Sequence, residues 1–280
     1  MLGKEYANHL PLLFQSFSDM NRRYRKKARE KKESTFIREI KRLYIVLFGI
    51  PEIGFQIRGI YFKKIMSCYL KNKRLKNILD AGCGIGAYTF FLSNLFPGSK
   101  VEGGDIDKFK LHWCQIMNEE LAIQNVSFSF LDISKKSKKD GFNLVVTIDV
   151  LEHIENYKTA IRNLHALLKK NGFLYIHVPQ PNQKRIIGAL KKWHHEDHVH
   201  EGISKNELEN TLKKTGFKII TSKETFGFFG KLAWEINHLA LSKSFVIAGI
   251  TFPFLYILAI IDGFWNNRKG LGLAVLAQKK

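Results

Sequence analysis

The stretch ILDAGCGIGAY, residues 78–88, decides the fold that we expect for this chain. A short apolar run ends at Asp80, and glycines follow at every second position as Gly82, Gly84 and Gly86. Glycine lets the backbone turn tightly and approach a ligand closely, and a helix N-terminus beyond it offers free N–H groups. The pattern therefore predicts a buried strand, a ligand-binding loop and a helix. Its G-x-G-x-G spacing differs from the G-x-G-x-x-G dinucleotide fingerprint, so NAD is a poor fit.

Acidic residues close three consecutive predicted strands. Asp80 ends the first, Asp105 ends the second in VEGGDID, and Asp132 ends the third in SFLDIS. An acid at the end of the second strand suits the hydroxyl groups of a ribose. An acid beside the glycine loop favours a ligand that carries positive charge there. The alternative is that these residues only form turns and cap helices.

The rest of the central sequence alternates between strands and helices. The short apolar runs NILDAG, KVEGGDI, VSFSFLD, FNLVVTI and FLYIHVP mostly lack polar alternation. Strands buried on both faces have this pattern, and the helical segments between them favour a parallel, doubly wound α/β sheet. FKIITS and the C-terminal GLGLAVLAQKK, residues 270–280, are two further predicted strands.

Composition narrows the surroundings of the protein. The formal net charge of +20 favours nucleic acid or an anionic membrane face, although a solvated basic surface explains it equally well. Cys68, Cys83 and Cys114 form no CxxC pair, which argues against a disulfide framework or a cysteine zinc site and suits a reducing compartment. The first residues show no secretory signal. We therefore expect a cytoplasmic protein, peripheral on the inner face of the membrane.

Residues 75–222 resemble the class I S-adenosylmethionine-dependent methyltransferases of the type 11 group, which is similar to ubiquinone-pathway (UbiE-like) enzymes. The matching pieces are ILDAGCGIGAY, VEGGDID, LDIS, FNLVVTIDVLEHIEN and LLKKNGFLYIHVP. The resemblance implies a mostly parallel, seven-stranded Rossmann-like sheet and S-adenosyl-L-methionine as cofactor. It also implies that the glycine loop and Asp80 hold the methionine part, Asp105 the ribose and Asp132 the adenine. Asp149, after the fourth strand, is expected to join them.

Candidate catalytic residues lie in TIDVLEHI and in KKWHHEDHVHEG. Methyl transfer mainly requires alignment of a nucleophile, and a base only where the acceptor loses a proton. Glu152, His153 and His198 are the candidates for this role, with His200 as a further residue on the substrate side. The alternatives are that Glu152 and His153 only pack near the cofactor, and that the histidines between 194 and 200 form a solvated loop.

The same region has a weaker resemblance to a metal site. Asp149, Glu152, His153 and His198 resemble the ligands of small-RNA 2′-O-methyltransferases, and such a set would suit Mg²⁺ or Mn²⁺. The chain carries Asp where those enzymes carry their first Glu, and it lacks their aromatic residue after the motif. We therefore expect no bound metal.

We divide the chain into three parts by sequence. Residues 1–74 form a basic and amphipathic helical region, and residues 75–225 with 270–280 form the methyltransferase domain. Residues 226–269 form an apolar helical hairpin inserted before the last strand.

The second arm of this hairpin contains FVIAGITFPFLYILAII, residues 245–261, which has no charge. It is barely long enough to cross a membrane, which needs about 20 residues. A single crossing would also separate the last strand from its sheet. We therefore expect the hairpin to lie on a membrane face, where Trp234, Trp265 and nearby basic residues suit the headgroup boundary. The alternative is that it packs on the N-terminal helices and closes the pocket.

These features lead to three functional hypotheses. The first is an enzyme that methylates a hydrophobic or lipid-linked small molecule, on oxygen or carbon, at an anionic membrane face. The second is an RNA 2′-O-methyltransferase, which would use the basic run NRRYRKKAREKK at 21–32. Nucleic acid is the less favoured partner because no aromatic platform beyond Tyr24 interleaves that run. The third is a non-catalytic cofactor-binding subunit.

Overall fold

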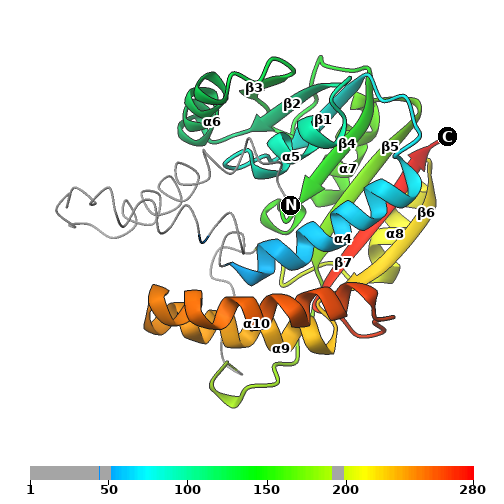
Figure 1. Ribbon diagram of the computed structural model, residues 1–280. Coiled ribbons are helices and arrows are strands. Elements are labelled where there is room, and N and C mark those ends of the chain that lie inside the picture. Colours follow the sequence, from blue (N-terminus) through cyan, green and yellow to red (C-terminus); the bar gives the residue numbers. More distant parts are fainter. Residues whose placement is uncertain (1–43, 45–51, 191–198) are drawn as a thin grey trace.

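The computed structural model describes residue 44 and residues 52–190 and 199–280 (Figure 1). Its centre is a seven-stranded sheet in the order β3-β2-β1-β4-β5-β7-β6. The strands are β1 (Asn77–Ala81), β2 (Lys100–Asp105), β3 (Val126–Phe130), β4 (Phe142–Ile148), β5 (Leu168–Pro179), β6 (Phe217–Thr225) and β7 (Gly272–Lys279). Strands β1 to β5 pair in parallel, and β7 runs antiparallel between β5 and β6. The predicted fold class is confirmed.

Helices cover both faces of this sheet. They are α4 (Ile53–Tyr69), α5 (Ala87–Leu95), α6 (Lys108–Leu121), α7 (Tyr157–Leu167), α8 (Lys205–Lys214), α9 (Phe228–Lys243) and α10 (Phe245–Phe264), with 3₁₀ turns η1 (Leu151–His153) and η2 (Gly188–Leu190). Neighbouring strand residues face opposite cores: Ile78 packs with α4, α5 and α6, whereas Leu79 packs with α7 and α8. Both faces of β1, β4, β5 and β7 are therefore largely buried, which explains the absence of polar alternation in these strands, whereas β3 alternates between buried and exposed residues.

The helices α9 and α10 form a hairpin between β6 and β7, side by side and next to α4 (Figure 1). Ser244 joins them and accepts a hydrogen bond from Val246 N at 3.1 Å, which caps α10. Helix α10 stays continuous through Pro253. A proline leaves the carbonyl four residues earlier without its helical donor. That carbonyl, Gly249 O, instead accepts the Tyr44 hydroxyl at 2.6 Å.

A buried acid holds the hairpin in place. Asp262 has no exposed surface and accepts hydrogen bonds from the Tyr61 hydroxyl, Gly227 N and Gly230 N at 2.9–3.2 Å. Gly227 and Gly230 lie at the start of α9, where backbone N–H groups lack helical partners. The only charged side chain of α10 therefore caps α9 and points away from solvent.

Helix α10 has two apolar faces. Ala248, Phe252, Leu255 and Ala259 pack inward against α4 and α9. On the other side runs a set that we call the outer stripe of α10, and its side chains are between 37% and 78% exposed: Val246, Ile250, Phe254, Ile257, Ile261 and Phe264. The span Val246–Phe264 is long and apolar enough to cross a membrane by length and composition, and 33% of it is buried.

Candidate cofactor site and β4–β5 pocket

The glycine loop between β1 and α5 requires glycine for its backbone. Gly82, Gly84 and Gly86 have φ angles of 82°, 54° and 79°, which side chains rarely allow. A Cβ on Gly82 would lie 2.3 Å from a methyl carbon of Val150. A Cβ on Gly84 would meet nothing within 4 Å, so the loop leaves open space on this side. The open space is where a ligand can approach the backbone closely.

Asp80 lies beneath this loop. Its carboxyl group is 2% exposed and accepts the Thr89 hydroxyl at 2.7 Å. Burial raises its pKa to about 7; the hydrogen bond from Thr89 opposes this shift and the negative charge of Asp105 adds to it. This contact joins the end of β1 to α5, and the expected role of Asp80 toward the methionine part of the cofactor stays a prediction.

Asp105, at the end of β2, holds the glycine loop by a hydrogen bond to its backbone. One of its oxygens accepts Gly84 N at 2.8 Å and the other accepts Asp107 N at 2.9 Å. The next side chain, Ile106, is 64% exposed and lies next to the acid that holds the glycine loop. Our sequence reasoning missed Ile106, although a large apolar residue directly after the terminal acid was a visible signal.

Asp132 follows β3 at the same edge of the sheet. One oxygen of its carboxylate accepts both the backbone N and the hydroxyl of Ser134, and Lys135 Nζ lies 3.3 Å from the other. These contacts lower its pKa, with the Ser134 hydroxyl as the largest cause. The side chain thus forms a local turn, and its expected role toward an adenine remains a prediction.

Beside the glycine loop, a cavity of about 120 Å³ lies past the ends of β4 and β5, and we call it the β4–β5 pocket. Val150, which packs against Gly82, lies in the segment between β4 and η1 and connects the loop to this pocket. The pocket is lined by residues from five elements and the segments between them: Arg58, Asp149, Glu152, His153, His177, Pro179, Gln183, Arg185, Phe226, Trp234, Leu271 and Gly272.

The carboxylate of Asp149 is held by two partners. Its Oδ2 accepts Arg58 at 2.9 Å, and its Oδ1 lies 2.5 Å from Nδ1 of His177. The other ring nitrogen of His177 lies 2.9 Å from the Thr225 hydroxyl. Asp149 also has a φ of 52°, a conformation that costs free energy in a residue with a side chain. Both of its oxygens therefore have one side-chain partner each, and the expected role of Asp149 toward the cofactor stays a prediction.

Glu152 differs from Asp149. Its side chain is 1% exposed, and within the described part of the chain neither carboxyl oxygen has a hydrogen-bond partner. Burial is the largest cause that raises its pKa, the negative charge of Asp149 is the second, and together with smaller opposing effects they raise the pKa to about 9. A buried polar group without a partner is costly, so in a pocket wall it marks a place that a ligand can complete.

The candidate histidines lie in different settings. His153 is exposed at the rim of the β4–β5 pocket. Nε2 of His200 lies 3.1 Å from the carbonyl oxygen of Glu155. His198 lies outside the described residues, as do His194 and His195. Among residues 44, 52–190 and 199–280, no group of three or more His, Cys, Asp or Glu side chains could hold a metal ion.

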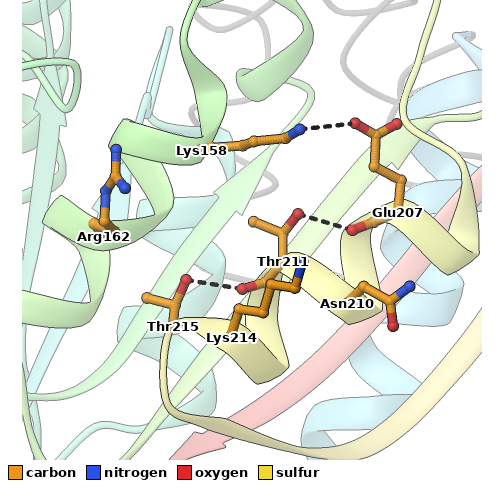
Figure 2. Close-up of a pocket in the computed structure, with 7 residues that line it drawn as sticks. All are labelled: Lys158, Arg162, Glu207, Asn210, Thr211, Lys214 and Thr215. Atoms are coloured by element: carbon orange, nitrogen blue, oxygen red, sulfur yellow. Dashed lines mark hydrogen bonds and ion pairs between the residues drawn. The ribbon is translucent and has the colours of Figure 1, made fainter.

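A second cavity, of about 340 Å³, lies between α7 and α8 (Figure 2). Lys158 faces Glu207 across it at 3.5 Å, and the hydroxyls of Thr211 and Thr215 donate to carbonyls of their own helix. Pairs of this kind are typical of solvated helix surfaces. The groove is therefore a poorer candidate for chemistry than the β4–β5 pocket.

Comparison with known proteins supports the fold and the class of enzyme. The family described as "Methyltransferase domain" matches residues 55–222. The chain is 21% identical to (S)-coclaurine N-methyltransferase of Thalictrum flavum subsp. glaucum over 64% of this chain and 47% of that protein. It is 32% identical to the mitochondrial ubiquinone biosynthesis O-methyltransferase of Dictyostelium discoideum over 36% of this chain and 34% of that protein.

A solved S-adenosylmethionine dependent methyltransferase from Mesorhizobium loti superimposes with a TM-score of 0.54 at 17% identity, covering 79% of this chain and 98% of the other. The chain spans about a third to a half of the length of the plant N-methyltransferases that it matches. The narrower type 11 grouping is not confirmed and stays a prediction. The broader assignment follows from the family match: this chain belongs to the methyltransferase-domain family, the class I S-adenosylmethionine-dependent methyltransferases.

Proposed function

We propose that the protein transfers a methyl group from S-adenosyl-L-methionine to a hydrophobic or lipid-linked small molecule at the inner face of a membrane. The residues around the glycine loop fit this cofactor. Open space lies over Gly84, the Asp105 carboxylate stands at the end of β2, and the exposed Ile106 offers an apolar surface for a base. When bound, the cofactor supplies an activated, positively charged methyl group.

The β4–β5 pocket is the proposed acceptor site. Glu152 is the residue that we assign to the acceptor's proton, because its buried carboxyl group has no partner among the described residues. Positive charge brought near a carboxyl group lowers its pKa, so the carboxylate form becomes available in the loaded protein. As the acceptor's lone pair took the methyl group, Glu152 would receive the proton that the acceptor loses. His153, at the exposed rim, is the second candidate base.

The choice of a hydrophobic acceptor rests on one observation: the hairpin that presents the outer stripe of α10 also contributes to the wall of the β4–β5 pocket. Trp234 lies on α9, and Phe226 and Leu271 flank the hairpin on either side. Exposed apolar area of this extent, in line along one helix, is typical of a surface that meets lipid or another apolar partner. An acceptor with an apolar tail would therefore find the pocket beside the hairpin that carries the outer stripe of α10.

The topology favours a helix lying on the membrane rather than crossing it. Both ends of α10 connect to elements on the same side of any membrane. Helix α9 precedes α10, and β7, which follows it, pairs with β5 and β6 of the central sheet. Lys243, Arg268 and Lys269 are exposed near the two ends of α10. Basic residues beside an apolar face favour anionic lipid headgroups.

Known relatives are consistent with a small acceptor. The names of two of them refer to coclaurine and to ubiquinone biosynthesis, and both are small-molecule chemistries. To test the proposal, the protein would be incubated with an extract of its host cells and S-adenosyl-L-methionine carrying a labelled methyl group. The extract is then separated into organic-soluble, RNA and protein fractions, with Asp105→Ala as the inactive control. Label in the organic phase is the expected result. Label confined to RNA or protein would overturn the proposed acceptor class.

A further inference from the structure

One acidic side chain in the wall of the β4–β5 pocket lacks a partner. The carboxyl group of Glu152 is 1% exposed and lines the cavity, and neither of its oxygens is hydrogen-bonded to another described residue. A buried acceptor without a donor costs free energy, and a charged one costs more. The pocket wall therefore presents an acceptor that a hydrogen-bond donor on a ligand can satisfy.

The backbone on both sides of Glu152 is anchored. Its carbonyl oxygen accepts the N–H groups of Val199 and His200, both at 3.1 Å, and the N–H group of Asp149 donates to the carbonyl oxygen of His177 at 3.0 Å. These bonds join the turn η1 to β5 and to the segment before α8. They hold the carboxyl group of Glu152 at the cavity.

The charges next to Glu152 leave it without a cation of its own. Arg58 pairs with Asp149 at 2.9 Å and with Glu52 at 3.5 Å. Burial is the largest cause of the raised pKa of Glu152, and among the neighbouring charges Asp149 has more effect than Arg58. Arg58 is therefore shared between two other acids and does not neutralise Glu152.

The other titratable groups of the lining also have acidic neighbours. Glu235 of α9 has no exposed surface, and its charge acts on Arg185. Nδ1 of His177 lies 2.5 Å from Oδ1 of Asp149, and His153 is exposed at the rim. Both arginines of the described lining thus have an acid beside them, so the pocket favours a ligand that brings positive charge to Glu152.

The size and walls of the cavity indicate which part of a ligand fits. Its volume is about 120 Å³, whereas sites that enclose a whole drug-sized ligand measure roughly 300–1,000 Å³. Phe226 and Leu271 contribute apolar surface to the same lining. The cavity therefore suits a small head group, and a longer apolar tail would extend beyond it.

We propose that the acceptor is an amine whose protonated nitrogen donates hydrogen bonds to the carboxylate of Glu152. The inference rests on the proposed function and narrows it, because it makes nitrogen the acceptor atom in place of the oxygen or carbon expected from the sequence. An ammonium group supplies both charge and several donors, whereas a hydroxyl supplies one donor and no charge. Transfer of one proton from the ammonium to the carboxylate leaves a neutral carboxyl group and a neutral amine, whose lone pair is then free for methylation.

The test measures binding without methyl transfer. Decylamine, below its micelle concentration, is titrated into the full chain by calorimetry. Decanol is the matched neutral alcohol, decanoate is the anion, and decyltrimethylammonium is a cation without N–H donors. We expect decylamine to bind at least about tenfold more tightly than each of the other three. Glu152→Gln should remove this advantage, and Glu155→Gln, at an exposed acid just beyond η1, should keep it.

Proton exchange gives a second measurement, which a merely structural role of Glu152 would not affect. The pKa of about 9 keeps this carboxyl group protonated in the empty pocket at neutral pH. Binding of the decylammonium ion should therefore release about one proton, measured by calorimetry in two buffers with different heats of ionisation. Binding to the Glu152→Gln protein should release none.

Equal affinity for decylamine and any of the three other compounds would overturn the proposal, as would unchanged decylamine binding by the Glu152→Gln protein. If Glu152→Gln weakened binding of S-adenosylmethionine instead, the positive charge of the cofactor would be the partner of Glu152, and the amine would be refuted. Circular dichroism checks that each variant is folded.

The labelled extract separates this inference from the proposed function. Organic-soluble label should be retained by a cation exchanger in methanol, because a methylated amine carries positive charge. Organic-soluble label that passes through the exchanger would refute only the amine. Label confined to RNA or protein would refute the proposed function itself.

Discussion

Replacing the centre of the outer stripe of α10 tests the membrane proposal most directly. The change is the triple variant Ile250→Gln, Phe254→Gln and Ile257→Gln. These side chains are 67%, 71% and 56% exposed, so most of their surface is available to lipid. Full burial of such a side chain contributes about 2 kcal/mol, so the exposed fractions of the three together contribute about 4 kcal/mol of lipid contact. That amount corresponds to about a thousandfold loss of membrane partitioning.

The assay is flotation with vesicles of neutral lipid and with vesicles that contain an anionic lipid. The wild-type protein should float with both, and more strongly with the anionic vesicles at low salt, because the charge contribution is screened by salt. The triple variant should stay at the bottom of the gradient. Tyr69→Gln, an exposed aromatic residue on α4 outside the stripe, is the matched control and should float as the wild type does.

Two results would refute the reasoning. Flotation of the triple variant equal to that of the wild type would mean that lipid does not contact the stripe. A wild-type dimer that becomes monomeric in the triple variant would show that a second copy covers the stripe instead. Because the three side chains are exposed, the variant should keep its stability within about 1 kcal/mol, so loss of flotation is not a loss of fold.

Four further predictions follow from single residues. Asp105→Ala should abolish binding of S-adenosylmethionine measured by calorimetry; unchanged affinity would contradict the site. Gly82→Ala should destabilise the protein by about 1–3 kcal/mol in urea, because of its positive φ and the Val150 contact, whereas Gly98→Ala, which meets nothing within 4 Å, should not. Asp262→Ala should cost about 3 kcal/mol or more by leaving buried donors unpaired, and Asp262→Asn should cost less; equal costs would argue against the cap. Because the pKa of Glu152 is raised, the folded state binds more protons than the unfolded state between pH 4.5 and about 9, so the free energy of unfolding should fall with rising pH by up to about 1.4 kcal/mol per pH unit. Glu152→Gln should flatten this fall. Parallel pH profiles of the two proteins in urea unfolding would contradict the role of Glu152.

The sequence by itself was sufficient for the sheet and for the glycine loop at its edge. Gly82, Gly84 and Gly86 could be interpreted correctly because the need for a left-handed backbone is local to each residue. Most of the strands could be recognised because burial on both faces removes polar alternation from their short apolar runs. Asp105 could be found because the carboxyl ends of parallel strands meet at one edge whatever else the chain does.

The β4–β5 pocket could not be predicted in the same way, because its parts come from distant segments. In the sequence, His177 is one residue of the apolar run FLYIHVP and has no distinguishing pattern around it. Only the folded sheet brings its ring nitrogens within hydrogen-bond distance of Asp149 and Thr225. Glu235 and Arg185 lie on an inserted helix and on a connecting segment, and no periodic pattern relates one to the other. Their contacts depend on how the hairpin packs.

The orientation of α10 was also decided only by tertiary structure. A helix that is apolar all round has no polar face to indicate which side is buried. Packing on α4 and α9 selects the side with the small residues Ala248 and Ala259, because small side chains allow close approach between helices. Asp262 then turns inward to cap α9. The sequence thus determined that an apolar hairpin precedes the last strand, and the packing around it decided which apolar face was left exposed.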